Sequence, residues 1–217
     1  MKVIGFSSGG TGHTGNVDRM VQAILEKSGH ESEFVKLTDL DYSACKGCVQ
    51  LCAKPQVCML ADDAQPYYQK IKEADAVVLG SPLYFGTVNA TMLSFVERFF
   101  GYRHVTVAIA KKPFVLVLGG GGRNLDTAEE RFRGVLQSSG IKVLDVVKYS
   151  SGIPPCLNCG RHKECTIGGL YGAIGKAAHT LDIQPEFFHR WEDRLVVSEA
   201  VDAAAEKLRG TLALARV

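Results

Sequence analysis

Neither sign of charge dominates this sequence. Its 217 residues carry 25 lysines and arginines against 23 aspartates and glutamates, which leaves a formal net charge of +2 with the six histidines neutral. The sequence also has no long basic run of the kind that neutralises the phosphates of a nucleic acid. Composition therefore argues against a nucleic-acid-binding protein.

Long hydrophobic runs are missing as well. The longest apolar stretches, such as residues 105–110 and 113–118, are far shorter than the roughly 20 residues that span a bilayer. The first residues lead directly into an apolar segment and a glycine-rich turn, without the charged head and cleavage site of a signal peptide. We therefore expect a cytoplasmic protein with no membrane span.

Short apolar segments alternate with amphipathic segments along most of the chain. Buried strands are predicted at residues 2–6, 33–37, 75–79, 113–118 and 141–149. Helices are predicted from about residue 17 to 27 and at about 62–73, 88–100, 125–138 and 193–214. This alternation predicts an α/β fold, in which helices cover both faces of a parallel sheet. We expect one domain over residues 1–217, with a cysteine-rich insertion at 41–60 and a cysteine loop and helix at 150–217.

The turn after the first predicted strand is rich in glycine and hydroxyl residues. In an open α/β sheet such a turn lies beyond the carboxyl ends of the strands, where the N-terminus of the next helix can bind a phosphate. The candidate phosphate-binding residues are Ser7, Ser8, Thr11, Thr14, Gly15, Asn16 and Val17. Asn16 is alternatively a helix cap, and Asp62 and Asp63 are interpreted as caps of the second helix.

Two further loops follow the third and fourth predicted strands. The first contains a Ser-Pro turn and an aromatic pair, which can border a flat ring, and its candidate residues are Pro82, Leu83, Tyr84, Phe85 and Gly86. The second contains four consecutive glycines, Gly119, Gly120, Gly121 and Gly122, which favour close approach of a ligand to the backbone. We expect all three loops to meet at one edge of the sheet.

These loops resemble those of the flavodoxin-like NAD(P)H-dependent FMN reductases. The most specific similarity is the segment GSPLYFGTVNATMLSFVER at residues 80–98, and the similarity covers roughly residues 1–150. The resemblance implies a five-stranded parallel sheet of order 2-1-3-4-5. It also implies that the phosphate of FMN binds at residues 8–17 and that the isoalloxazine lies against residues 82–86 and 119–122. The phosphate loop lacks the arginine usual in this family, and Thr11 and Thr14 are our candidates to replace it.

Seven cysteines are unusual in a chain of this composition. They fall into two groups, and a reducing cytoplasm disfavours disulfides, so grouped thiols indicate metal or redox chemistry. The first group, Cys45, Cys48, Cys52 and Cys58, has the spacing C-x2-C-x3-C-x5-C and is similar to the cluster motif of the iron-sulfur flavoprotein branch of the family. Four thiolates can hold a [4Fe-4S] cluster, with zinc or free redox-active thiols as alternatives. The first three cysteines would share one face if the segment were helical.

The second group is Cys156, Cys159 and Cys165, with His162 between the last two. A metal bound there would need a fourth ligand from His162, another residue or an external group, and the alternative is a thiol-rich loop that lines the cofactor site or a subunit contact. Phe187, Phe188 and Trp191 follow as residues that could cover a flavin. The histidines at 104, 179 and 189 have no partner that the sequence identifies.

These features together predict an FMN-dependent oxidoreductase. Electrons would pass from NAD(P)H or a ferredoxin-like donor through FMN to a quinone, a flavin or another small acceptor, with the chemistry at the cofactor and no acid or base residue assigned. The alternatives are an electron carrier between redox proteins and a zinc-stabilised flavin-binding protein. The resemblance also implies a homodimer or homotetramer.

Overall fold

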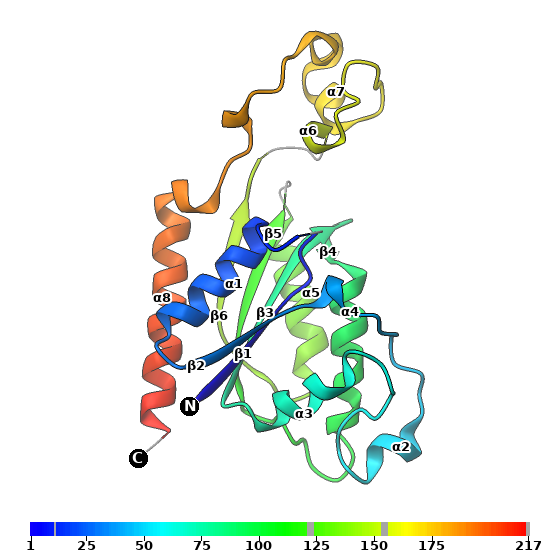
Figure 1. Ribbon diagram of the computed structural model, residues 1–217, viewed down its shortest axis with the longest axis vertical. Helices are drawn as coiled ribbons and strands as arrows, with labels where there is room; N and C mark the ends of the chain where they lie inside the picture. The colour runs from blue at the N-terminus through cyan, green and yellow to red at the C-terminus, as the bar shows by residue number, and fades with distance from the viewer. Residues whose placement is uncertain (11, 121–123, 153–155, 216–217) are drawn as a thin grey trace.

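The computed structural model describes residues 1–10, 12–120, 124–152 and 156–215 (Figure 1). Its strands are β1 (Lys2–Ser7), β2 (Glu31–Lys36), β3 (Ala76–Tyr84), β4 (Thr87–Val88), β5 (Pro113–Gly120) and β6 (Lys142–Ser150). Five of them form a parallel sheet in the order β2-β1-β3-β5-β6, and β4 pairs antiparallel with the end of β3. The predicted order of the five main strands is therefore confirmed, and the two-residue β4 is an addition to it.

Helices cover both faces of this sheet. The longer ones are α1 (Asn16–Lys27), α3 (Gln65–Glu73), α4 (Ala90–Glu97), α5 (Leu125–Gln137) and α8 (Leu195–Leu214). The shorter ones are α2 (Val49–Ala53), α6 (Cys156–Cys159) and α7 (Gly169–Ile174), with 3-10 turns η1 (Leu37–Asp39), η2 (Arg98–Tyr102), η3 (Gly175–Thr180), η4 (Pro185–Phe187) and η5 (Trp191–Asp193). The long helices begin and end within a few residues of the predicted positions.

The alternation of side chains along each strand divides the core into two layers. Phe6, Leu79 and Leu116 belong to the layer that α3, α4 and α5 cover. Val78 and Val117 belong to the opposite layer, which α1 and α8 cover. Because both faces of the central strands are buried, β3 and β5 are almost continuously apolar, as parallel strands in this type of sheet are.

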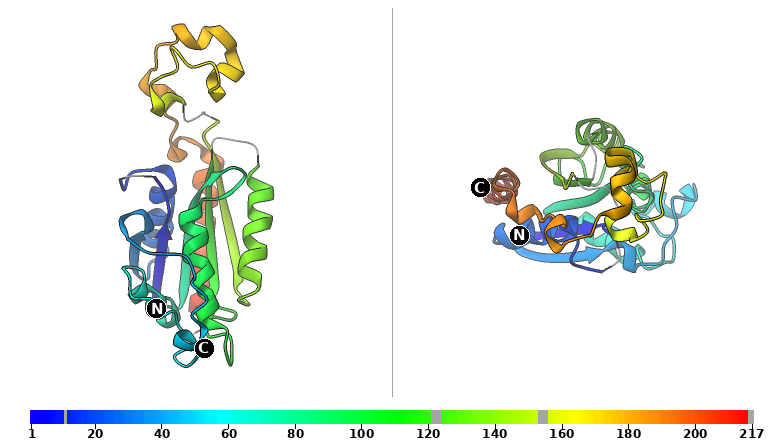
Figure 2. Two further views of the ribbon diagram at one scale, coloured as in Figure 1. Left: turned by 90° about the vertical axis from the view of Figure 1, so that its right-hand side faces the viewer. Right: turned by 90° about the horizontal axis from the view of Figure 1, so that it is seen from above.

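The two cysteine segments lie at opposite ends of the molecule. Figure 1 shows α6 and α7 in an excursion beyond the carboxyl ends of the strands, whereas α2 lies near their amino ends, and the side view in Figure 2 agrees. No helix in the described part of the chain combines the length and the apolar character needed to cross a membrane.

The predicted caps of α1 and α3 are wrong. Gly15 precedes α1 and Ala64 precedes α3, and neither position supplies a side-chain acceptor. Asp62 instead accepts a hydrogen bond from Arg98 Nη1 at 2.7 Å, and Asp63 accepts one from the backbone N–H of Asp41 at 2.8 Å. Both carboxylates are used to hold the segment before α3 rather than to begin the helix.

Candidate functional site

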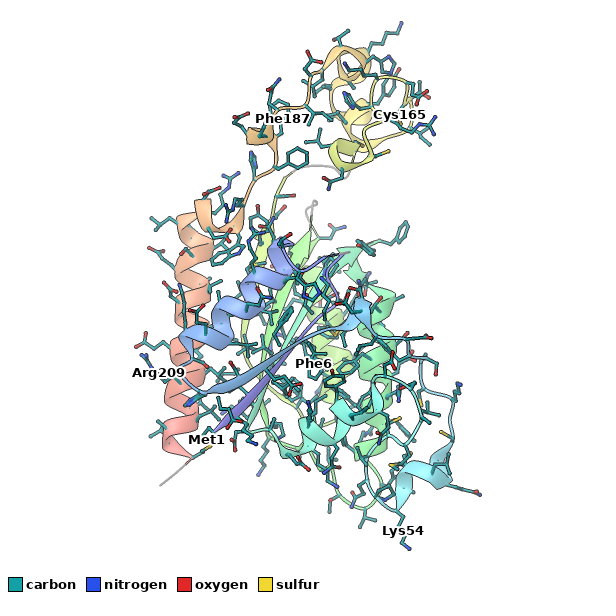
Figure 3. All side chains as sticks on the ribbon, viewed as in Figure 1. Met1, Phe6, Lys54, Cys165, Phe187 and Arg209 are labelled. Atoms are coloured by element: carbon teal, nitrogen blue, oxygen red, sulfur yellow. The ribbon has the colours of Figure 1, made fainter. Side chains whose placement is uncertain are left out.

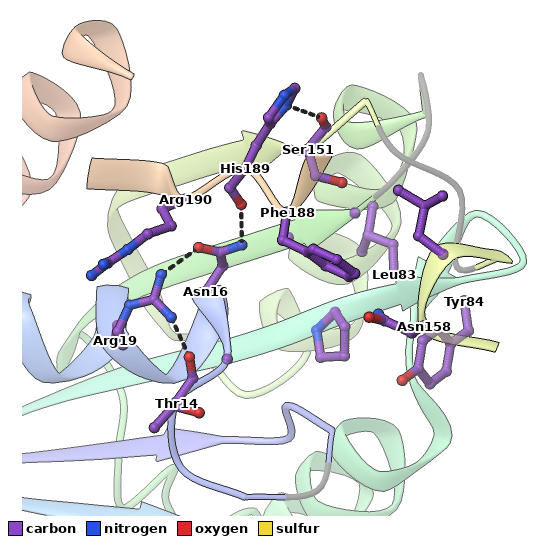
Figure 4. Close-up of a pocket in the computed structure, with 15 residues that line it drawn as sticks. Thr14, Asn16, Arg19, Leu83, Tyr84, Ser151, Asn158, Phe188, His189 and Arg190 are labelled. Atoms are coloured by element: carbon purple, nitrogen blue, oxygen red, sulfur yellow. Dashed lines mark hydrogen bonds between the residues drawn. The ribbon is translucent and has the colours of Figure 1, made fainter. Parts of the chain in front are cut away.

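A cavity of about 910 Å³ opens at the carboxyl ends of the parallel strands (Figure 4). This volume lies within the range of small-molecule and cofactor sites. The residues around it come from the loops after β1, β3 and β5 and from the C-terminal excursion. They are Thr14, Gly15, Asn16, Arg19, Pro82, Leu83, Tyr84, Gly119, Gly120, Ser151, Leu157, Asn158, Phe188, His189 and Arg190.

The three predicted loops therefore contribute to one cavity. A smaller recess of about 200 Å³ shares several of these residues and adds Gly9, Gly10 and Val17, next to the N-terminus of α1. Because Gly15 has no side chain to accept hydrogen bonds from the first turn of α1, those N–H groups are left for another acceptor, such as an anion. Thr11, Gly121 and Gly122 lie outside the described residues.

Some candidate residues do not line the cavity. Phe85 is fully exposed and has a positive φ of 53° at the tip of the β3–β4 hairpin. Gly86 also has a positive φ, and its carbonyl accepts a hydrogen bond from Arg131 at 3.2 Å. This hairpin turns both residues away from the nearby wall formed by Pro82, Leu83 and Tyr84.

Ser7 and Ser8 lie where β1 leads into the glycine-rich loop. Both are buried, and the Ser7 hydroxyl donates to Asp18 Oδ1 at 2.5 Å. Asp18 also accepts from Lys36 Nζ at 2.5 Å, in an ion pair whose two side chains are each 1% exposed. A Cβ at Gly9 would lie 2.6 Å from Asp18 and 2.9 Å from Lys36, so glycine is required where the loop crosses this pair.

The C-terminal excursion closes one side of the cavity through residues 188–192, which we call the arm. The Asn16 side chain binds the arm at two points, since it donates to the His189 carbonyl at 3.2 Å and accepts from the Trp191 N–H at 3.1 Å. The Tyr149 hydroxyl donates to the same carbonyl at 3.0 Å. Asn16 therefore holds the arm in place, a role that sequence analysis did not identify because its partner is 173 residues away.

An ion pair between α1 and the arm strengthens this contact. Arg19 Nε donates to Glu192 at 2.7 Å, and Arg19 also donates to Asn16 Oδ1 at 2.7 Å and to the Thr14 carbonyl. The hydrogen bond with Glu192 raises the pKa of Arg19. Burial opposes ionisation of Glu192, but its bonds with Arg19 outweigh burial and lower the pKa of Glu192. Both groups are held in their charged forms beside the cavity.

The cavity wall opposite Asn16 is largely apolar. Figure 4 shows Phe188 on the same side as Leu83, Tyr84 and Asn158. Of the aromatic residues predicted to cover a cofactor, Phe188 lines the cavity, whereas Trp191 is buried in the layer of α1 and α8. The sequence analysis did not identify Leu157 and Asn158 as cavity residues. Their position between two cysteines of the second group was the sequence feature that could have pointed to them.

The first cysteine segment packs against α4 and η2. Cys52 and Cys58 are buried, whereas Cys45 is exposed. Cys52 Sγ lies 3.1 Å from His104 Nε2, which gives this histidine a partner that the sequence did not reveal. Burial raises the pKa of the Cys52 thiol, and the three other cysteines add to this effect.

Arg98 joins this segment to the domain. Its guanidinium is fully buried and donates to Cys58 Sγ at 3.1 Å, to Asp62 Oδ2 at 2.7 Å and to the Ser43 carbonyl at 3.3 Å. It also lies 4.6 Å from the ring centre of Tyr68. One side chain thus fixes both ends of the loop that contains the four cysteines.

The first three cysteines are not on one helix. Because α2 begins at Val49, Cys45 and Cys48 precede it and do not share a helical face with Cys52. The segment lies at the end of the subunit opposite to the cavity (Figures 1 and 2). Among the residues that the structure describes, no three His, Cys, Asp or Glu side chains meet closely enough to hold a metal ion.

A model of the NADPH-dependent FMN reductase family matches residues 1–153. The chain belongs to this family. The curated proteins that this FMN reductase family member matches include iron-sulfur flavoproteins. An iron-sulfur flavoprotein of Methanocaldococcus jannaschii is 39% identical over 101 residues, which are 45% of this chain and 51% of the relative. One of Archaeoglobus fulgidus is 35% identical over 46% of this chain and 49% of the relative. The chain thus spans about half the length of these relatives.

Solved structures of low sequence identity share the fold of this family member. The match to a flavone reductase has a TM-score of 0.56 at 16% identity. It covers 96% of this chain and 63% of the flavone reductase chain. The match to RosB, which was solved with a bound intermediate, has a TM-score of 0.58 at 15% identity. It covers 97% of this chain and 81% of the RosB chain. These similarities establish the flavodoxin-like α/β fold.

Proposed function

We propose that the protein binds FMN in the large cavity and transfers electrons between a nicotinamide or protein donor and a small acceptor. The observation that carries this proposal is the convergence of the three loops, after β1, β3 and β5, on one cavity at the carboxyl edge of the sheet. Such an edge is where open α/β sheets bind their ligands. When bound, FMN would supply hydride and single-electron chemistry, which no side chain provides.

The chain's own residues would position the cofactor. The recess beside Gly9, Gly10 and the first turn of α1 suits the phosphate, because backbone N–H groups and the positive end of the helix dipole favour an anion there. The wall formed by Pro82, Leu83 and Tyr84, with Gly119 and Gly120, suits the ring system, because proline and tyrosine rings can border a flat ring and glycines let it approach the backbone. Phe188 and Asn158 would shield this ring from water on the excursion side.

We further propose that Cys45, Cys48, Cys52 and Cys58 hold a [4Fe-4S] cluster, which would supply single-electron transfer. Four thiols on one loop match the ligand number of such a cluster, and Arg98 already donates to the sulfur of Cys58. Because the segment lies at the far end from the cavity, its electrons would reach the FMN of a second copy of the chain more directly than its own. A homo-oligomer is thus part of the proposal.

Cofactor analysis of protein purified without oxygen tests both sites. We expect one FMN and four iron atoms with sulfide per chain, reduced by NADH, NADPH or a ferredoxin-like donor. Cys45→Ser should lose the iron, whereas Cys159→Ser, which removes another exposed thiol, should keep it. Zinc without sulfide in the first segment would contradict the cluster, and a chain purified without FMN that does not bind added FMN would contradict the whole function.

The variant Gly119→Ala tests the position of FMN. A Cβ at Gly119 would lie 2.5 Å from Val17 Cγ2, and because Val17 is stiff, the first turn of α1 must move. We expect FMN to bind about tenfold more weakly or worse, which corresponds to about 1.4 kcal/mol. Gly134→Ala is the control, since nothing lies within 4 Å of the added Cβ in α5. Equal FMN affinity of the two variants, measured by fluorescence titration, would exclude a phosphate site at this turn.

A further inference from the structure

The second cysteine segment is not used by the proposed flavin or cluster chemistry. Cys156, Cys159, His162 and Cys165 recur at every third position in the sequence CLNCGRHKEC. All four lie in the excursion beyond the cavity, where Figure 3 labels Cys165. Three soft thiol ligands and one imidazole so close in sequence are an unusual concentration of metal-ligating groups.

Two of these sulfurs converge on the same backbone turn. A Cβ at Gly168 would lie 2.9 Å from Cys156 Sγ and 3.1 Å from Cys165 Sγ, so both sulfurs border the same point beside this glycine. The Gly168 N–H donates to Cys165 Sγ at 3.1 Å, and the Leu170 N–H donates to Cys156 Sγ at 3.4 Å. Both sulfurs thus accept hydrogen bonds from the backbone of the same turn.

Cys159 is linked to Cys156 by the short helix α6. This helix begins at Cys156 and ends at Cys159. A spacing of three residues places two side chains on the same face of a helical turn. Cys159 is therefore on the same side of this turn as Cys156, and it is the exposed member of the three thiols.

His162 has the tautomer of a metal ligand. It is 6% exposed, and its Nε2 lies 2.8 Å from the Leu181 carbonyl. A carbonyl only accepts, so Nε2 must carry the proton and Nδ1 has a free lone pair. Among the described residues, this buried Nδ1 has no hydrogen-bond partner. Metal-binding histidines usually donate their second ring N–H to a backbone carbonyl or carboxylate in this way.

We propose that Cys156, Cys159, His162 and Cys165 bind one zinc ion. Three thiolates and one imidazole are a common tetrahedral set for structural zinc, whereas a [4Fe-4S] cluster ordinarily takes four cysteines. No three of these four side chains meet at metal-binding distances in the described structure, so zinc would have to draw the thiols and the imidazole together. Metal binding commonly orders a loop in this way.

Zinc analysis of the full chain tests the proposal. In a Cys45→Ser/Cys48→Ser background, which removes two exposed or half-buried ligands of the first segment, we expect one zinc per chain after dialysis. Cys159→Ser and His162→Ala should each weaken zinc binding by more than the tenfold typical of losing an outer-shell partner, measured by competition with a chromogenic chelator. His13→Ala is the control, because this exposed histidine lies outside the segment and pairs with Asp39, and it should keep the zinc.

Cobalt replaces zinc in a second measurement that does not depend on the background variant. Metal-free wild-type chain with added Co²⁺ should show the charge-transfer bands of thiolate ligands and the intense visible bands of a tetrahedral site, and Cys159→Ser should lose the part that this segment contributes. Zinc retained equally by Cys159→Ser and His162→Ala would overturn the proposal. So would a disulfide between Cys156 and Cys165, seen as two missing thiols, or iron and sulfide that remain after the first segment is disabled.

Discussion

At the scale of single residues, Arg98 has the largest structural role outside the cavity. Its guanidinium joins a cysteine sulfur, a carboxylate and two backbone carbonyls on a loop that starts 55 residues earlier in the chain. A fully buried cation is costly unless all of its donors are satisfied, and here the cysteine loop supplies the acceptors. The fold of the loop and the charge of Arg98 therefore depend on each other.

Arg98→Lys should destabilise the protein by about 3 kcal/mol, because a lysine keeps the charge but cannot reach Cys58, Asp62 and Ser43 together. Urea unfolding followed by circular dichroism measures this, and the Cys58 thiol should also react faster with a thiol reagent. Arg133→Lys is the control, since its pair with Glu129 is half exposed and is worth less than about 1 kcal/mol. Equal stability of the two variants would show that the loop does not depend on Arg98.

At the scale of elements, the arm depends on α1 for its position. Asn16, Arg19 and Tyr149 all bond to residues 189–192, and the buried ring of Trp191 adds an apolar contact with the layer of α1 and α8. Most of these bonds come from the turn that begins α1, which is also the proposed phosphate site. Binding of an anion there and docking of the arm thus use the same few residues.

The arm should undock in acid. Glu192 has a pKa below its ordinary value of 4.5, so its ion pair contributes to stability fully above that pH and is lost as the pH falls through the lower, folded pKa. Trp191 is the chain's one tryptophan and is 5% exposed, so its fluorescence should shift to the red below about pH 4.5, before circular dichroism shows loss of the fold. Glu192→Gln should remove this step. If the fluorescence of that variant shifts to the red by the same amount, undocking in acid would be caused by other carboxylates.

Local pattern predicted the elements well, and distance along the chain explains what it missed. The helix predicted from about residue 17 to 27 is present, and its apolar residues Val17, Met20, Val21, Ile24 and Leu25 are buried, because an amphipathic period indicates which face of a helix is covered. The partners of Asp62, His104 and Asn16 lie 36, 52 and more than 170 residues away. No periodicity encodes such pairs, so the sequence suggested caps and unpaired histidines where the fold makes long-range contacts.

The cavity was partly predictable for the same reason. The loops after parallel strands must gather at one edge of the sheet, which placed Thr14, Pro82 and Gly119 together. The wall from Leu157 to Asn158 depends instead on how the excursion folds back over that edge, and its irregular sequence has no period from which to infer this.

At the scale of the whole molecule, the proposed FMN site and the first cysteine segment lie at opposite ends of the subunit. Protein between two redox centres slows electron transfer, so association of subunits in which one copy's cysteine loop meets another copy's cavity would shorten the path. The exposed ring of Phe85 beside that cavity is available for such a contact in the isolated chain.

Electron transfer between cluster and FMN should therefore depend on protein concentration. Anaerobic rapid-mixing experiments at decreasing concentration should show slower transfer once the oligomer dissociates, with the oligomeric state measured in parallel by light scattering. Phe85→Ser should shift both curves to higher concentration. A transfer rate that stays constant while the oligomer falls apart would show that each subunit carries its own complete path.

Both cysteine segments are inserted into connections between elements and leave the strands in register. The first occupies the crossover from β2 to α3, and the second lies between β6 and α8. The pairing of β1 with β3 and of β3 with β5 is continuous, and neither cysteine segment takes part in it. The sheet is thus independent of both segments, and the proposed metal sites could be gained or lost in evolution while the proposed flavin site stays the same.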